Sequence, residues 1–252
     1  ELTQMQTIIQ KEIERFGRNI FREGASVVPG GMTVNNKYEF IKIAATTNLP
    51  SDTSSMIGDT FTGQTSGVAC KILEVIPATG SDPATIYVQY TNRSSVAISG
   101  AAIRMSPAEN IVGASSGVTL TVQATNTSSN RAIGRGTKAS MQTGTFFTQG
   151  HFVQADEQEV MISKYDSAPD ENVGFVVNQD IVTVSDTLAL YDNQGTLPNL
   201  TAPGADRYRI QLTLTTESEK DAADTFVFYG KIRDGLLIET VTGTDEYNKI
   251  AQ

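Results

Sequence analysis

The chain of 252 residues contains a single cysteine, Cys70, so it can form no intrachain disulfide. The absence of disulfides is typical of proteins that assemble in a reducing cytosol. Cys70 lies in the apolar alternation of residues 68–73. That pattern predicts a small buried hydrophobic residue rather than a nucleophile.

Histidine is equally scarce, because His151 is the only one in the chain. A histidine-based metal site, a Ser-His-Asp triad and a Cys-His dyad therefore all lack partners, unless Cys70 lies beside His151. We expect His151 to be an ordinary strand residue. No calcium-binding loop, P-loop or Gly-x-Gly-x-x-Gly motif is present. The sequence thus predicts no catalytic, cofactor-binding or metal-binding residues and a protein that is not an enzyme.

Acidic residues gather in two short segments. A glycosidase needs two carboxylates that face each other in a cleft, about 5–9 Å apart. Both segments instead read as turns between strands, where solvated acids are usual. Loop acids are the favoured interpretation, and a polysaccharide depolymerase is the less favoured alternative. The six acids are Asp156, Glu157, Glu159, Asp166, Asp170 and Glu171.

Long apolar runs and basic clusters are also missing. No segment approaches the roughly 18 apolar residues that a membrane-spanning helix requires. The net charge is -9, and the Lys and Arg residues are scattered singly. Because phosphate-backbone binding needs several clustered cations, we expect neither nucleic-acid binding nor membrane insertion.

The first residues show a helical period. Apolar residues recur every three or four positions, with most charges off that line, which predicts one amphipathic helix over residues 3–23. A lone helix of about 20 residues is marginal in water, so its apolar stripe must be covered. The chain's own sheet is the favoured cover. Bundling with copies of itself is second, because the spacing is not a clean heptad and Gly17 interrupts the helix. The stripe consists of Leu2, Met5, Ile9, Ile13, Phe16 and Ile20.

The rest of the chain reads as short strands and turns. The firmest strand covers residues 207–214, where apolar and polar residues alternate. Asp234-Gly235 is expected to join two strands in a hairpin. An echo between residues 65–68 and 115–118 is of a kind that arises by composition in a segment rich in Ser and Thr, and we give it no weight.

These patterns predict a mainly β fold. An N-terminal amphipathic helix precedes an antiparallel β-sandwich or barrel-like domain, into which a second small β-domain is inserted. We expect a docking helix at residues 1–25, the main β-domain at residues 26–50 and 138–252, and the inserted β-domain at residues 51–137.

Segments near both ends of the chain share their order and spacing with one known family. They are GTFFTQGHFV at 144–153, VGF at 173–175, IVT at 181–183, DN at 192–193 and APGADRY at 202–208, with ELTQMQ at 1–6, FREG at 21–24 and VPGG at 28–31. Together they resemble a family of tailed-bacteriophage virion proteins, mostly described as structural, baseplate or tail-fibre proteins that carry a domain of unknown function. The resemblance covers residues 1–44 and 144 to about 240, and the middle matches more loosely through residues 60–67.

The resemblance implies a non-enzymatic virion structural protein. It would be a tail or baseplate component, assembled in the host bacterial cytoplasm, that serves as an attachment module for a fibre or a neighbouring tail protein. Other tail or baseplate proteins are the implied partners, in a homotrimer or multi-copy ring, with the apolar stripe as the contact. The family is also expected to continue beyond the end of this chain. The alternative is an adhesin domain of a tail fibre that binds host glycans through exposed aromatic residues of the inserted domain, such as Tyr87 and Tyr90.

Overall fold

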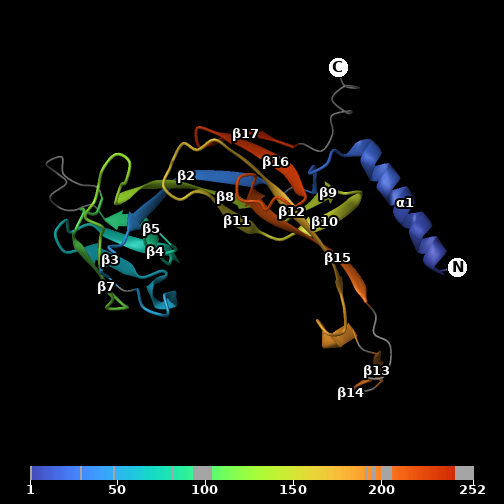
Figure 1. The fold of residues 1–252 in the computed structure, drawn as a ribbon, viewed down its shortest axis with the longest axis horizontal. Coiled ribbons are helices and arrows are strands. Elements are labelled where there is room, and N and C mark those ends of the chain that lie inside the picture. Colours follow the sequence, from blue (N-terminus) through green and yellow to red (C-terminus); the bar gives the residue numbers. More distant parts are fainter. Residues whose placement is uncertain are drawn as a thin grey trace. The chain divides into compact units, whose positions relative to one another are not determined.

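The chain is mainly β, with one N-terminal helix and several antiparallel sheets (Figure 1). This confirms the predicted fold class. The helix α1 spans Leu2–Ile20. The computed structural model describes residues 2–28, 30–47, 49–80, 82–92, 104–190, 192–194, 197–199 and 206–241.

The chain divides into two compact units, of which the second is inserted into the first. The first boundary lies at Thr33/Val34 rather than at residue 50 as predicted, because the strand that begins at Met32 continues into the inserted unit. The second boundary, Lys138/Ala139, lies beside the predicted one. Unit 1 comprises Glu1–Thr33, Ala139–Val160 and Asp170–Gln252, and unit 2 comprises Val34–Lys138 and Met161–Pro169.

The largest sheet has eight strands in the order β11-β8-β2-β5-β4-β3-β6-β7. Short connections and antiparallel pairing agree with the turn-rich sequence of this region. A single 3₁₀ turn, Ser54–Met56, precedes β3. The strands are β2 (Met32–Lys42), β3 (Thr60–Gly63), β4 (Ala69–Ile76), β5 (Thr85–Asn92), β6 (Asn110–Gly113), β7 (Thr119–Thr121), β8 (Ile133–Met141) and β11 (Gln158–Ser163).

Strands β2 to β7 of this sheet close on themselves into a small barrel in unit 2. Ile43, directly after β2, forms an antiparallel bridge with Val122, directly after β7. The backbone N–H of Gln123 donates to the carbonyl of Lys42 at 2.8 Å. Closure of this kind leaves no free edge between the first and last strands. The enclosed core includes Ile41, Ile43, Met56, Phe61, Cys70, Ile72, Ile86, Ile111 and Leu120.

The barrel contains a repeat that sequence reasoning dismissed. Strands β3 and β6 pair antiparallel about Thr62 and Val112, and each is followed by a tight turn that ends in a glycine of positive φ. The segments Asp59–Val68 and Glu109–Val118 are therefore equivalent by a local two-fold relation. Their shared pattern is an acid, an apolar residue two positions later, a glycine two further on, and then Ser-Gly-Val.

The two acids cap each other's turns. Asp59 accepts hydrogen bonds from the backbone N–H groups of Ser115 and Ser116, the latter at 2.8 Å, and from the Ser116 hydroxyl at 2.7 Å. Glu109 accepts from the Ser66 N–H and the Ser66 hydroxyl, both at 2.9 Å. Buried N–H groups without acceptors destabilise a fold, so the carboxylates stabilise both turns. The short echo in the sequence leaves out the acid that begins each longer segment. A comparison of the longer segments would have revealed the repeat.

Unit 1 contains the three remaining sheets. Their orders are β1-β9-β10, β15-β12-β16-β17 and β13-β14. A short 3₁₀ helix spans Leu188–Leu190. The strands are β1 (Ser26–Val28), β9 (Gly144–Thr148), β10 (His151–Ala155), β12 (Glu171–Val182), β13 (Asp192–Gln194), β14 (Leu197–Asn199), β15 (Arg207–Thr216), β16 (Phe226–Arg233) and β17 (Leu236–Thr240).

Three aromatic rings form the centre of unit 1. Phe146 lies 4.7 Å from Phe175 and 5.3 Å from Tyr229 between ring centres. The hydroxyl of Tyr229 donates to the carbonyl of Gly30 at 2.8 Å, so this buried hydroxyl has an acceptor. These contacts join β9, β12 and β16 to the segment that precedes β2.

Two local predictions in unit 1 are confirmed. Along β15, Leu212 and Leu214 are buried and Gln211 and Thr213 are exposed, whereas Tyr208 near the strand start remains exposed. Asp234 and Gly235 adopt φ of 50° and 69° and join β16 to β17. Positive φ at both central residues is the requirement of a two-residue hairpin turn.

We expect Asp59→Asn to destabilise the chain by about 2 kcal/mol at pH 7, because an amide oxygen replaces a carboxylate that accepts several hydrogen bonds. Burial raises the pKa of Asp59, but the bonds from Ser116, Ser115 and Thr60 outweigh it and lower the pKa to about 2. This lies below the unfolded value of about 3.9, so the stabilisation is complete above that pH and is lost as the pH falls toward 2.

Urea unfolding between pH 7 and pH 2.5 measures this contribution. The difference between wild type and Asp59→Asn should shrink through the acid range. Asp156→Asn, an exposed turn acid, is the matched control and should change stability by less than about 0.5 kcal/mol. A penalty for Asp59→Asn that stays constant with pH contradicts the proposed role of the charge.

Candidate functional sites: an exposed helix face and a polar cleft

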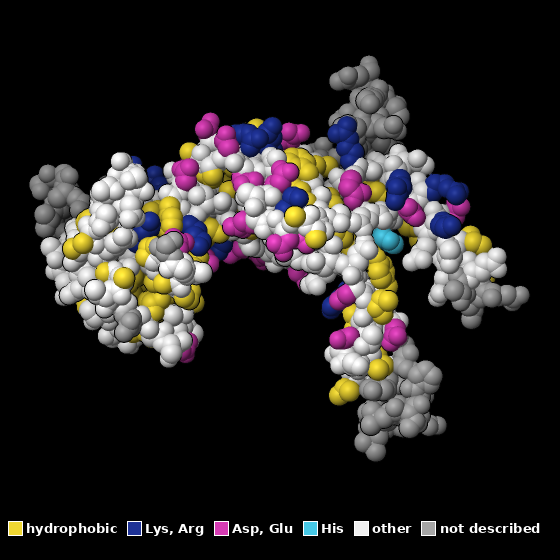
Figure 2. Space-filling view, in the orientation of Figure 1, with side chains coloured by type: hydrophobic (Ala, Val, Ile, Leu, Met, Phe, Trp, Pro, Cys, Tyr) yellow, Lys and Arg dark blue, Asp and Glu magenta, His cyan; other side chains and the backbone are white. Residues whose placement is uncertain are grey.

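The helix α1 presents apolar side chains to solvent (Figure 2). Ile8, beside the predicted stripe, is also exposed. Large exposed apolar patches mark sites of protein or ligand contact. Four stripe members keep 47–61% of their surface exposed: Met5, Ile9, Ile13 and Phe16.

The helix is held at its C-terminal base by aromatic packing within unit 1. Gly17 is buried, and a Cβ at this position would overlap the Phe147 ring. Phe21, just after the helix, packs against Phe147 with 5.9 Å between ring centres and edge-on against Phe152 at 5.5 Å. Gly17 therefore allows close approach of the helix base to β9, and it does not interrupt the helix.

Polar contacts reinforce the same base. Glu23 accepts a hydrogen bond from the Thr148 hydroxyl at 2.8 Å and one from the Gln149 backbone N–H at 2.7 Å. Gly24, with φ of 79°, makes the turn that leads into β1. The helix thus ends at Ile20, because the chain turns over residues 21–25 where the prediction had extended the helix to residue 23.

The favoured expectation that α1 covers the chain's own sheet is wrong. Its apolar stripe stays open to solvent from Met5 to Phe16, and only the base, where Ile20 is half-buried, approaches the rest of unit 1. Leu2 lies in the first turn of the helix. The second interpretation, bundling with copies of the chain itself, stays a prediction.

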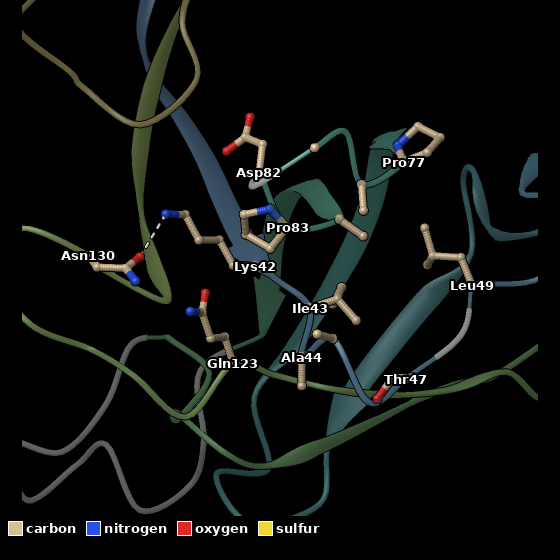
Figure 3. A pocket seen from close by; sticks show the side chains of 14 residues that line it. Lys42, Ile43, Ala44, Thr47, Leu49, Pro77, Asp82, Pro83, Gln123 and Asn130 are labelled. Atoms are coloured by element: carbon tan, nitrogen blue, oxygen red, sulfur yellow. Dashed lines mark hydrogen bonds between the residues drawn. The ribbon is translucent and has the colours of Figure 1, made fainter.

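A second candidate site is a cleft of about 760 Å³ beside the barrel closure. Its size is within the range of small-molecule sites, about 300–1,000 Å³. In Figure 3 the side chains of Lys42, Gln123 and Asn130 lie at one end, and Leu49 and Pro77 lie at the other. The cleft thus has a polar end and an apolar end.

Lys42 dominates the electrostatics of that polar end. The residue is only 6% exposed, its Nζ donates to Asn130 Oδ1 at 3.0 Å, and it lies 3.8 Å from the centre of the Tyr165 ring. Burial lowers the pKa of Lys42, and the charge of Asp82 opposes that effect. The result is a cation with a fixed position at the edge of the cleft.

Asp82 is already engaged by other partners. Its carboxylate accepts from Lys164 Nζ at 2.8 Å and from the Tyr165 hydroxyl at 2.9 Å. Burial raises the pKa of Asp82, but these two bonds lower it further than burial raises it. Asp82 therefore orients Tyr165 under Lys42 and leaves the Lys42 charge only partly balanced.

The structure assigns ordinary roles to Cys70 and His151. Cys70 is fully buried in the barrel core, where burial raises the pKa of its thiol to about 12, as the sequence pattern predicted for a hydrophobic residue. His151 begins β10 and lies 6.3 Å from the Tyr208 ring. The two residues belong to different units. Among the described residues, no group of three His, Cys, Asp or Glu side chains is arranged to hold a metal ion.

Several of the predicted loop acids serve as hydrogen-bond acceptors in turns. Asp166 accepts from the Ala168 N–H at 3.0 Å, and Asp170 accepts from the Asp234 N–H at 2.9 Å. Glu171 accepts from the Ser218 hydroxyl at 2.6 Å. Asp166 and Asp170 have the roles expected for acids in loops, whereas Glu159 lies within β11 and Glu171 begins β12, so the prediction of a loop position is wrong for these two. The depolymerase alternative gains no support from these contacts.

The aromatic residues of the glycan-binding alternative are not on the surface. Tyr87 is fully buried, stacks on Tyr38 at 4.6 Å between ring centres and donates to the carbonyl of Lys164. Tyr90 is half-buried against the barrel core. The prediction of exposure is wrong for Tyr87, because the face of β5 that carries it is covered by the aromatic cluster around Tyr38. Tyr90 is only partly exposed, because it packs against the barrel core.

No family model, curated protein or solved structure matches this chain. In the described part of the chain, no helix is both long enough and apolar enough to cross a membrane.

We expect Gly17→Val to release the helix base, because its side chain must displace the Phe147 ring, at a cost of about 1–3 kcal/mol. Hydrogen exchange at the Gly24 N–H, which donates to the Phe147 carbonyl, should accelerate at least tenfold. Gln10→Val introduces the same residue at an exposed helix position and is the control. Equal exchange rates in the two variants would contradict this account of the base.

Proposed function

We propose that this chain is a non-enzymatic structural protein of a bacteriophage virion. It is a tail or baseplate component that serves as an attachment module for a fibre or a neighbouring tail protein. The observation that carries the proposal is the apolar stripe of α1, which is exposed from Met5 to Phe16, while the helix packs on unit 1 at its base. The resemblance of both chain ends to virion proteins gives the stripe its biological setting.

The stripe has a periodicity that suits association with copies of itself. Its members follow one another at intervals of 3, 4, 4, 3 and 4 residues. This is an 11-residue repeat, in which Met5 corresponds to Phe16 and Ile9 to Ile20. Such a repeat keeps one seam on a nearly straight helix and favours a slight right-handed supercoil, unlike the left-handed heptad. The spacing of the stripe residues, which is irregular as a heptad, is thus regular as an 11-residue repeat.

The residues beside the stripe favour parallel copies. Glu12 lies on one flank, whereas Gln6 and Gln10 lie on the other. In an antiparallel pair like flanks meet, which would bring two Glu12 side chains together near the middle of the stripe. In a parallel bundle unlike flanks meet, and Glu12 faces neutral side chains. The exposed Ile8 widens the face on the Glu12 side, which suits a helix with two neighbours, as in a homotrimer or a ring.

Self-association is testable on the purified chain. We expect size-exclusion chromatography with light scattering to show an oligomer at micromolar concentration, and Ile9→Asp or Phe16→Asp to shift it to monomer, because each buries a charge in an apolar seam. Gln4→Asp, which adds the same residue on the opposite, exposed face, should leave the oligomer intact. A wild-type monomer, or equal dissociation by all three variants, contradicts the proposed contact.

The virion setting has its own test. Fab fragments raised against the barrel unit should label the tail or baseplate of particles that contain this chain, as seen by negative-stain electron microscopy. Particles produced with the Phe16→Asp variant should lose the label, because the module no longer assembles. Labelling of the capsid alone would contradict the proposed location.

A further inference from the structure

A second cleft in unit 2, of about 550 Å³, shares Lys42 with the first cleft. Four cations line it, whereas Asp166 is its only acidic lining residue in the described part of the chain. The chain as a whole has 19 basic and 28 acidic residues, so this basic cleft reverses the overall charge balance. Its cations are Lys42, Arg104, Arg131 and Arg135.

Two of these cations are held in place by one buried acid. Oε1 of Glu39 accepts from Arg104 Nη2 and from Arg135 Nε, each at 2.8 Å. The Glu39 side chain is only 15% exposed. One carboxylate therefore orients two guanidinium groups and neutralises only one of them. Arginine held in this way offers its remaining N–H groups to a carboxylate or phosphate in a bidentate geometry.

The remaining charged residues of the cleft do not neutralise its excess of positive charge. Arg131 is exposed and forms no ion pair with any described residue. Lys42 is bonded to the neutral amide of Asn130, and Asp82, which is already paired with Lys164 and does not line this cleft, balances the Lys42 charge only in part. The carboxylate of Asp166 accepts from the Ala168 N–H in its own turn. With Glu39 included, four cations face two carboxylates, and the cleft retains a positive excess that attracts anions.

One rim of the cleft carries hydroxyl groups on an ordered loop. The Thr127 N–H donates to the carbonyl of Asn130 at 3.1 Å, and the Asn130 N–H returns to the Thr127 hydroxyl at 3.1 Å. Ser128 and Ser129 line the cleft from this loop. Serine hydroxyls donate and accept, which suits the hydroxyl groups of a sugar.

We propose that the basic cleft binds a sugar that carries a carboxylate or phosphate group. The arginines and Lys42 bind the anionic group, and the serine rim contacts the ring hydroxyls. The volume exceeds that of a lone phosphate ion and is appropriate for one or two sugar rings. This site is separate from the helix face and does not use Tyr87 or Tyr90.

Isothermal titration of the full chain at low salt tests the proposal with glucuronate, glucose 6-phosphate, inorganic phosphate and glucose. We expect one or both anionic sugars to bind with Kd on the order of 1 mM or tighter, and the tighter of the two identifies the anionic group. Glucose should bind at least tenfold more weakly. Glucose that binds as tightly as the anionic sugars overturns the proposal. The absence of binding by either anionic sugar at about 20 mM, 20-fold above the expected Kd, also overturns it.

Two variants locate the binding. Arg131→Ser should weaken the anionic sugar at least tenfold without unfolding the barrel, since Arg131 makes no ion pair with the described residues. Lys71→Ser removes an exposed charge elsewhere in unit 2 and should have no effect. Equal loss in both variants overturns the site. Ser129→Ala should weaken the sugar and leave inorganic phosphate unchanged, and phosphate that binds as tightly as the sugars overturns the sugar assignment.

Discussion

The barrel depends on two buried carboxylates that satisfy backbone N–H groups which no strand partner reaches. Each tight turn after β3 and β6 points its amides inward, and a glycine of positive φ completes it. Asp59 and Glu109 provide the acceptors from opposite sides. With both turns fixed, β7 lies where Val122 can bridge Ile43. Lys42, one residue before that bridge, is thereby placed at the edge of both clefts.

A different constraint governs α1. Its apolar stripe costs solvation free energy while it is exposed, and a helix of 19 residues gains little from propensity alone. The base at Gly17 and Phe21 fixes the direction of the helix and orders its last turn. Any chain that covers the stripe then stabilises the helix by mass action. In the proposed oligomer, assembly and helix stability are consequently coupled, and the 11-residue period favours another copy as the cover.

The sequence predicted the features that depend on neighbours along the chain. The alternation of β15 and the Asp234-Gly235 hairpin follow from local geometry, as does the amphipathic helix. The predicted domain boundary at residue 50 was wrong because β2 is one continuous strand shared by both units. No turn residues mark the point where β2 passes from one unit to the other. The prediction that Tyr87 is exposed was wrong because the alternation of residues along a strand does not show which face of the strand a second layer covers. The basic cleft was missed because its four cations are far apart in sequence.

The repeat in the barrel shows why amino-acid composition alone could not decide whether the short sequence match had structural meaning. Three identical residues in a Ser- and Thr-rich segment are uninformative, but the match extends to an acid whose partner lies in the other copy. Asp59 serves the turn at Ser116, and Glu109 serves the turn at Ser66. Each half thus lacks the acceptor for its own turn and supplies the one needed by the other. Loss of either acid therefore leaves the turn N–H groups of the other half without their acceptor.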